Sequence, residues 1–267
     1  MDIFQIILSF AVSLGAGIVG AVSGAGSGII VRPVLDFFTE MPTYYTSLLS
    51  SLAVFTMALT AFIKQGKNMK NVKIAVALPI AIGSTIGGTL GNLIFSTIRA
   101  AADVLILGIV QAVVMITVVG ILLIHQVVED RVTSFHWSGI PTFLMLGTVL
   151  GMIAAFLGIG GGPLNLSSLS FFASMNIKVA ALYSIFIITF AQGANLTRWA
   201  FLTEAGWPDV SFYLIIAVVS GSIIGAFIGA GMYKKVDRRF LKMSYCGVLI
   251  FVILITTVNL VIDLLAL

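Results

Sequence analysis

Eight long apolar stretches constrain this sequence more than any other feature. Each has about the 20 residues that a helix needs to cross a bilayer, and they cover residues 3–23, 44–63, 74–95, 101–124, 138–157, 179–197, 210–232 and 243–265. Only 9% of the 267 residues are charged, against about 25% in soluble domains. The stretches do not alternate apolar and polar residues, which excludes an outer-membrane barrel. The sequence therefore predicts an all-α polytopic protein of the cell (inner or plasma) membrane.

The composition also argues against several classes of function. One cysteine cannot close a disulfide, and the two histidines flank a polar loop, so no His/Cys cluster indicates a metal site. A serine nucleophile at Ser27 would need a nearby base, which makes an intramembrane enzyme a weak alternative. The chain starts Met1-Asp2, acidic rather than basic, so no cleavable signal is expected. We expect neither an enzyme, nor a cofactor, nor a nucleic-acid partner.

The chain repeats itself. A shift of 134 positions places the glycines at 24, 26 and 28 on those at 158, 160 and 162. The same shift matches Phe37-Phe38 to Phe171-Phe172, and a four-residue adjustment then matches the glycine-spaced segment 83–91 to 221–229. Matches in the same order along the chain predict two homologous halves, residues 1–128 and 129–267, within one integrated membrane domain.

The positive charges indicate how the halves are oriented. Nine of the 14 Lys and Arg residues lie in two short loops, 64–73 and 234–242, and the positive-inside rule places both loops in the cytoplasm. The first loop follows the second long helix of its half, whereas the second follows the third. Equivalent helices would then cross the membrane in opposite directions, which requires an odd number of crossings in each half.

Two short apolar segments, 29–38 and 163–174, supply the missing fifth crossing. We therefore expect two inverted repeats of about five membrane segments each, with four long helices and one short, broken-helix segment per half. Many secondary transporters have this architecture. Both termini would lie outside and the central loop 125–136 in the cytoplasm. The alternative, eight spans in parallel halves, would put one basic loop outside.

Two glycine-rich stretches, 24–28 and 158–162, predict the substrate site. Such stretches disrupt a helix, and a break at membrane depth is tolerated only where protein or a water-filled cavity satisfies the freed backbone groups. The helix that restarts after each break presents unpaired N–H groups and a positive dipole end, which suit an anion. Two breaks from inverted halves would meet near the pseudo-twofold axis. Close helix packing is the alternative, and it is favoured for segments 83–91 and 221–229.

Polar residues in the apolar segments near the breaks complete the candidate site, because burying them without a partner is costly. Arg32 could complement an anion or reach the interface beside Asp36. Gln192 and Asn195 share one helix face and could instead hydrogen-bond another helix. The candidate substrate-binding residues are Gly24, Gly26, Ser27, Gly28, Arg32, Gly158, Gly160, Gly161, Gly162, Asn165, Ser167, Gln192 and Asn195.

These residues carry a resemblance to a known family. The run GAGSGIIVRP from Gly24 to Pro33 resembles the G-x-G-G-G-x4-P signature of the TauE/SafE family of anion permeases, and Thr46-Ser47-Leu48 resembles its T-S-L. Segment 158–162 resembles the second copy, although Ser167 stands where the first copy has proline. The resemblance implies transport, usually export, of small sulfur-containing anions such as sulfite, sulfoacetate or related sulfonates.

We therefore expect a secondary transporter that exports a small anion by alternating access. The membrane potential supplies about 2.3 kcal/mol per charge per 100 mV, and a negative interior favours expulsion of an anion. An anion channel with re-entrant glycine loops and a membrane component of a larger complex are alternatives. The expected partners are the anionic substrate and the lipid bilayer, and a homodimer is a further candidate assembly.

Overall fold

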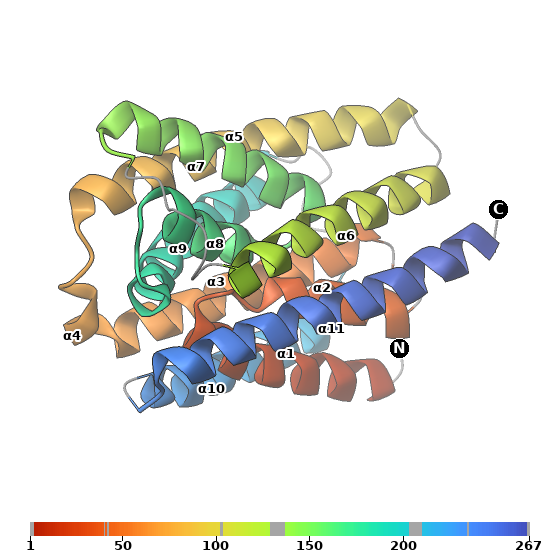
Figure 1. The fold of residues 1–267 in the computed structure, drawn as a ribbon. Helices are drawn as coiled ribbons and strands as arrows, with labels where there is room; N and C mark the ends of the chain where they lie inside the picture. The colour runs from red at the N-terminus through yellow and green to blue at the C-terminus, as the bar shows by residue number, and fades with distance from the viewer. Residues whose placement is uncertain are drawn as a thin grey trace.

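The structure is a computed structural model that describes residues 3–39, 41, 43–101, 104–128, 137–202, 210–233 and 235–265. These residues form a bundle of helices joined by turns (Figure 1), without a β-strand in the ranges just given. Within them, eight helices are long and apolar enough to cross a membrane. The expected class, an all-α polytopic membrane protein, is confirmed.

The helices follow the predicted segments closely. The first half contains α1 (Ile3–Ser23), α2 (Gly28–Phe38), α3 (Thr43–Lys64), α4 (Gly66–Met69), α5 (Ile74–Ala101) and α6 (Val104–Val128). The second half contains α7 (Ile140–Leu157), α8 (Gly162–Phe172), α9 (Ile177–Leu202), α10 (Phe212–Met232) and α11 (Arg238–Leu265). The two short apolar segments are the helices α2 and α8, of 11 residues each, and each follows a glycine-rich break.

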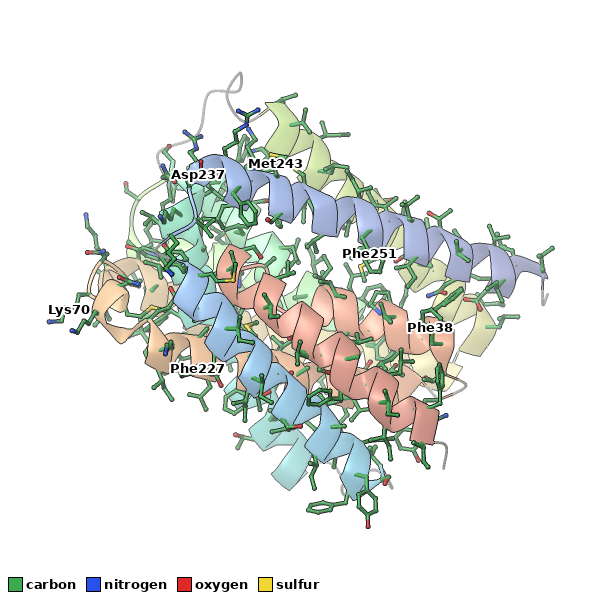
Figure 2. The ribbon with its side chains drawn as sticks, turned by 90° about the horizontal axis from the view of Figure 1, so that it is seen from below. Phe38, Lys70, Phe227, Asp237, Met243 and Phe251 are labelled. Carbon is green, nitrogen blue, oxygen red and sulfur yellow. The ribbon has the colours of Figure 1, made fainter. Side chains whose placement is uncertain are left out.

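Large apolar side chains cover the outside of the bundle. Phe227, Met243 and Phe251 point outward in Figure 2, and they are 55%, 65% and 45% exposed. Such a surface is stable against lipid tails, and it would drive aggregation in water. The exposed apolar surface therefore belongs in contact with the bilayer.

Both basic loops lie at one end of the bundle. In Figure 1, α4 and the turn from α10 to α11 lie at the end opposite to the start of α1 and the end of α11. Figure 2 places Lys70 and Asp237 toward that same end and Phe38 toward the other. The expected boundary after residue 128 coincides with the end of α6, while residues 129–136 of the central loop lie outside the described residues. That this end faces the cytoplasm, and that the halves are inverted, stay predictions.

The most extensive helix–helix interfaces join the two halves. Helix α1 packs along α10 and α5 packs along α7, and the sequence repeat exchanges these two pairs. Helices α3 and α9 pack on each other, as do α6 and α11, and each of these pairs consists of two counterparts. This is the contact pattern that two halves related by a pseudo-twofold axis produce.

The glycine-spaced faces of α5 and α10 allow the closest of these contacts. A Cβ at Gly87 would overlap the backbone carbonyl of Thr148 in α7, and one at Gly225 would overlap that of Leu14 in α1. Thr148 and Leu14 are related by the same shift of 134 positions. The packing interpretation of segments 83–91 and 221–229 is confirmed, since side chains there would hold the helix backbones apart.

We expect Gly87→Leu to destabilise the protein by at least about 3 kcal/mol, because the new side chain must push α7 away from α5. The measurement is the yield of monodisperse protein in detergent together with its unfolding temperature. Gly231→Leu is the control, since a Cβ at Gly231 on α10 meets no atom within 4 Å. Equal losses for the two variants would contradict the packing role of Gly87.

Single cysteines at positions 70 and 237 test the orientation of the halves. In a Cys246→Ser background, we expect Lys70→Cys and Asp237→Cys to react with an impermeant thiol reagent from the same side of the membrane. Parallel halves would place the two positions on opposite sides. Reaction of the two cysteines from opposite sides would therefore overturn the inverted arrangement.

Candidate functional site

The two breaks share a backbone conformation at equivalent positions. Gly26 and Gly160 have φ values of +79° and +75°, which L side chains rarely adopt. The next pair differs, since Gly161 has φ +79° whereas Ser27 has φ −85°, an ordinary helical value. Ser27 stands where the signature G-x-G-G-G has a glycine. Its ordinary φ value shows that glycine is not required at this position.

The breaks meet backbone to backbone at the centre of the molecule. A Cβ at Gly28 would lie 3.0 Å from the carbonyl oxygen of Ile159, and one at Gly162 would overlap the carbonyl of Ala25. The shift of 134 positions relates these two contacts. The Ser184 hydroxyl also lies within hydrogen-bond distance of a carbonyl in each half, at 2.7 Å from Gly24 O and 3.2 Å from Gly162 O. The meeting point is packed backbone, so space for a ligand must lie beside it.

Beside the second break lies a cavity of about 40 Å³, which we call the carboxamide cavity. Five of the candidate residues line it: Gly160, Gly161, Asn165, Gln192 and Asn195. Helix α5 contributes three residues that the sequence analysis missed: Ser84, Gly88 and Asn92. Asn92 carries a signal that could have found it, because it is a polar residue within an apolar stretch, as Gln192 and Asn195 are.

The carboxamides of the cavity are only partly paired. Asn92 Nδ2 donates to Asn195 Oδ1 at 3.1 Å, and Asn195 Nδ2 lies 3.5 Å from Gln192 Oε1. The bond between Asn92 and Asn195 joins α5 to α9. It is the interhelical hydrogen bond that the sequence analysis gave as the alternative role for this face of α9. Asn165 is only 3% exposed, yet its carboxamide, like Nε2 of Gln192, donates to none of the described residues. The cavity is thus surrounded by more hydrogen-bond donors than the protein itself uses.

Backbone groups add to this set of donors. Gly160 and Gly161 line the cavity immediately before α8 begins at Gly162, and their N–H groups have no partner in the described part of the chain. The start of a helix carries about half a positive charge. Spare N–H donors and a positive helix end together favour a small anion over a cation.

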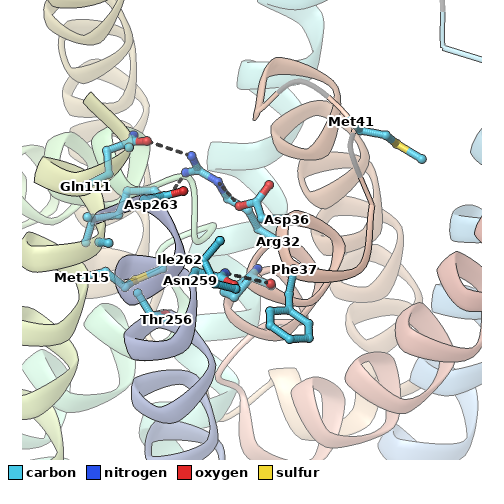
Figure 3. Close-up of a pocket in the computed structure, with 14 residues that line it drawn as sticks. Arg32, Asp36, Phe37, Met41, Gln111, Met115, Thr256, Asn259, Ile262 and Asp263 are labelled. Atoms are coloured by element: carbon cyan, nitrogen blue, oxygen red, sulfur yellow. Dashed lines mark hydrogen bonds and ion pairs between the residues drawn. The ribbon is translucent and has the colours of Figure 1, made fainter. Parts of the chain in front are cut away.

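Arg32 is buried and contacts several groups of the protein. It is 5% exposed, and Figure 3 shows it pointing from α2 toward Gln111, with Asp36 beside it. Its guanidinium donates to the backbone carbonyl of Leu157 and, at 3.1 Å, to Gln111 Oε1, and it lies 3.6 Å from Asp36. Gln111 in turn donates to the carbonyl of Phe156 at 2.6 Å. Arg32 and Gln111 therefore cap the last turn of α7, whose carbonyls the second break leaves without helical partners.

Arg32 lies on a second cavity, of about 250 Å³, between α2, α6 and α11. Asp36, Asn259 and Asp263 line the same cavity, and Asn259 lies within hydrogen-bond distance (3.4 Å) of the carbonyl of Pro33. Arg32 does not line the carboxamide cavity. It is buried beside Asp36 and does not extend to the surface of the bundle.

The remaining candidates lie in packing contacts. The Ser167 hydroxyl is 2.9 Å from that of Tyr245, which donates to the carbonyl of Pro163, so Ser167 ties α8 to α11. A Cβ at Gly158 would overlap the guanidinium of Arg32. Gly24, Gly26, Ser27 and Gly28 of the first half line neither of the two cavities. The structure thus gathers five second-half candidates, together with residues of α5, around the carboxamide cavity.

We expect Arg32→Gln to destabilise the protein by about 1–3 kcal/mol, because it removes the buried donor to the carbonyl of Leu157 and the cation beside the half-buried Asp36. The double variant Arg32→Gln/Asp36→Asn should recover part of this loss, since neither charge then remains. Unfolding temperatures in detergent measure both effects. A folded Arg32→Gln protein with unchanged stability would contradict the capping role.

Comparisons with known proteins place the chain in a family. A family model described as "Sulfite exporter TauE/SafE" matches residues 9–256. The "Probable membrane transporter protein YunE" of Bacillus subtilis (strain 168) is 22% identical over 264 residues, which cover 89% of this chain and 92% of the relative. The "Probable membrane transporter protein YdhB" of the same organism is 24% identical over 235 residues, covering 85% and 89%. No solved structure matches. Because the family match spans most of the sequence, the chain belongs to the TauE/SafE family of multi-pass membrane transporters.

Proposed function

We propose that this chain is a secondary transporter that exports small sulfur-containing oxoanions, with sulfite as the substrate that fits best, by alternating access through the carboxamide cavity. The observation that carries the proposal is the excess of hydrogen-bond donors around that cavity. Asn165, Gln192 and the N–H groups of Gly160 and Gly161 all lie there with donors that the protein does not use. The description of the matching family, "Sulfite exporter TauE/SafE", supports the same substrate class.

Neutral donors suit a transporter better than a fixed cation does. A hydrogen bond to a charged group contributes about 1.5–3 kcal/mol, so several such bonds together can replace much of the water that an oxoanion loses. A transport site must also release its ligand, and binding that is too strong prevents release. The divergent oxygens of sulfite can accept from the helix start and from the carboxamides of α8 and α9 together.

The size of the carboxamide cavity favours a small substrate. A volume of about 40 Å³ corresponds to roughly three water-sized spheres, at about 10–15 Å³ each. Sulfite has four non-hydrogen atoms, so it requires only a small expansion. Sulfoacetate has twice as many and requires α5 and α9 to move apart.

The driving force follows from the charge of the substrate. A negative cell interior favours the outward movement of an anion by about 2.3 kcal/mol per charge per 100 mV, and twice that for a dianion. The basic loops at one end of the bundle would raise the local concentration of anions at the cytoplasmic entrance.

Uptake of radiolabelled sulfite into proteoliposomes tests the function. An inside-positive potential should accelerate uptake and an inside-negative potential should slow it, because the anion carries its charge across the membrane. Empty liposomes are the control. Uptake no greater than in empty liposomes at either potential would overturn the proposal for sulfite, and the same assay with sulfoacetate tests the size argument.

Counterflow separates the carrier from the channel with re-entrant loops. We expect saturable flux and accelerated exchange when unlabelled sulfite is loaded on the far side, because a carrier must bind its ligand before it moves it. The two breaks are packed against each other, which supports a carrier. Single-channel currents in planar bilayers would instead identify a pore.

A further inference from the structure

We infer that the anion site exists only once in this chain, between α5 and α9, and that the equivalent interface between α10 and α3 is a closed apolar contact. This inference rests on the proposed function and narrows it, because it assigns substrate selection to carboxamides present in one interface and absent from its counterpart. The repeated glycine breaks by themselves would predict two equivalent sites, or one shared site on the axis between them.

The repeat identifies the counterpart of each residue of the carboxamide cavity. The shift of 134 positions takes Gln192 to Ala58, Asn195 to Ala61 and Asn165 to Val31. The adjusted shift takes Asn92 to Ala230 and Gly88 to Ala226. Four carboxamides in one interface therefore correspond to three alanines and one valine in the other.

In the interface between α10 and α3, apolar side chains fill the position that corresponds to the carboxamide cavity. Ala58, Ala61, Ala226 and Ala230 are 0–5% exposed and belong to one apolar cluster, together with Ala21, Val54, Met57, Ile185 and Ile188. Val31, the counterpart of Asn165, is fully buried. Ser27 and Ser222 contribute buried hydroxyls without a hydrogen-bond partner in the described part of the chain. This interface therefore lacks the cluster of spare donors that an oxoanion would need.

The backbone of the two breaks is the same at Gly26 and Gly160, and it differs at the next pair, Ser27 and Gly161. Gly26 and Gly160 share a left-handed conformation, and their ideal Cβ positions face equivalent side chains, Ile188 at 3.6 Å and Val54 at 3.0 Å. A short helix starts after each break, α2 in one half and α8 in the other. A helix start is thus common to both halves, whereas the four carboxamides are present in one interface and absent from the other.

Replacing each carboxamide by its own counterpart tests the inference. The variants are Asn92→Ala, Asn165→Val, Gln192→Ala and Asn195→Ala. We expect each of Asn165→Val and Gln192→Ala to lower kcat/KM for sulfite by about tenfold to a hundredfold, the loss of one hydrogen bond to a charged ligand. The fold should survive, because the other half already packs these residues in the same helix setting, and size-exclusion profiles and unfolding temperatures check this.

Two substitutions in the apolar interface are the matched controls. Ala58→Ser and Ala230→Ser add one hydroxyl each, which can bond to a carbonyl of its own helix, and both should leave the KM for sulfite within about twofold of the wild type. A larger change in KM with an unchanged unfolding temperature would show that the anion also contacts this interface, and it would overturn the inference.

Binding of radiolabelled sulfite to the purified protein supplies a second readout. We expect one anion per chain, and we expect Asn165→Val to weaken this binding by about tenfold to a hundredfold. Two anions per wild-type chain would overturn the single site while leaving sulfite export intact. Carboxamide variants that bind and transport normally would overturn both the single site and the route through the carboxamide cavity, although wild-type transport would still identify a sulfite exporter. A wild-type protein that neither binds nor carries sulfite would overturn the proposed function, and this inference with it.

Discussion

The close approach of two interrupted helices holds this molecule together at its centre. Gly162 of the second half lies against the carbonyl of Ala25 in the first, and Gly28 lies against the carbonyl of Ile159. A side chain at either glycine would separate the halves. The freed backbone groups of a break need partners within the bilayer, and here Ser184 and Arg32 supply several of them from distant parts of the chain.

The glycines have two different structural roles. At Gly87 and Gly225 the missing side chain lets two helices touch, whereas at Gly26 and Gly160 it permits a turn of the chain that other residues disfavour. In the proposed site, substrate recognition depends on ordinary side chains placed beside one of the turns. The same backbone can therefore serve as a contact in one half and as part of a site in the other.

The long helices, the two short helices and their breaks could all be predicted, because apolar length and glycine density are local properties of the sequence. The role of Arg32 could not, because its partners Gln111 and Leu157 lie 79 and 125 residues away in the sequence. Asn92 was missed for a similar reason, since its importance depends on lying opposite Asn195, 103 residues along the chain. Predicting a repeat shows which residues are equivalent, but it does not show which interface keeps a cavity.

The pairing of α1 with α10 has a consequence for how the protein is made. Synthesis proceeds from the N-terminus, so α1 enters the membrane before its partner, which begins at Phe212, has been translated. The contact between Gly225 and Leu14 cannot form until then, and the bond from Ser184 to Gly24 cannot form until α9 has been translated. The first half therefore enters the bilayer without these contacts, and its break gains them only when the second half has been made.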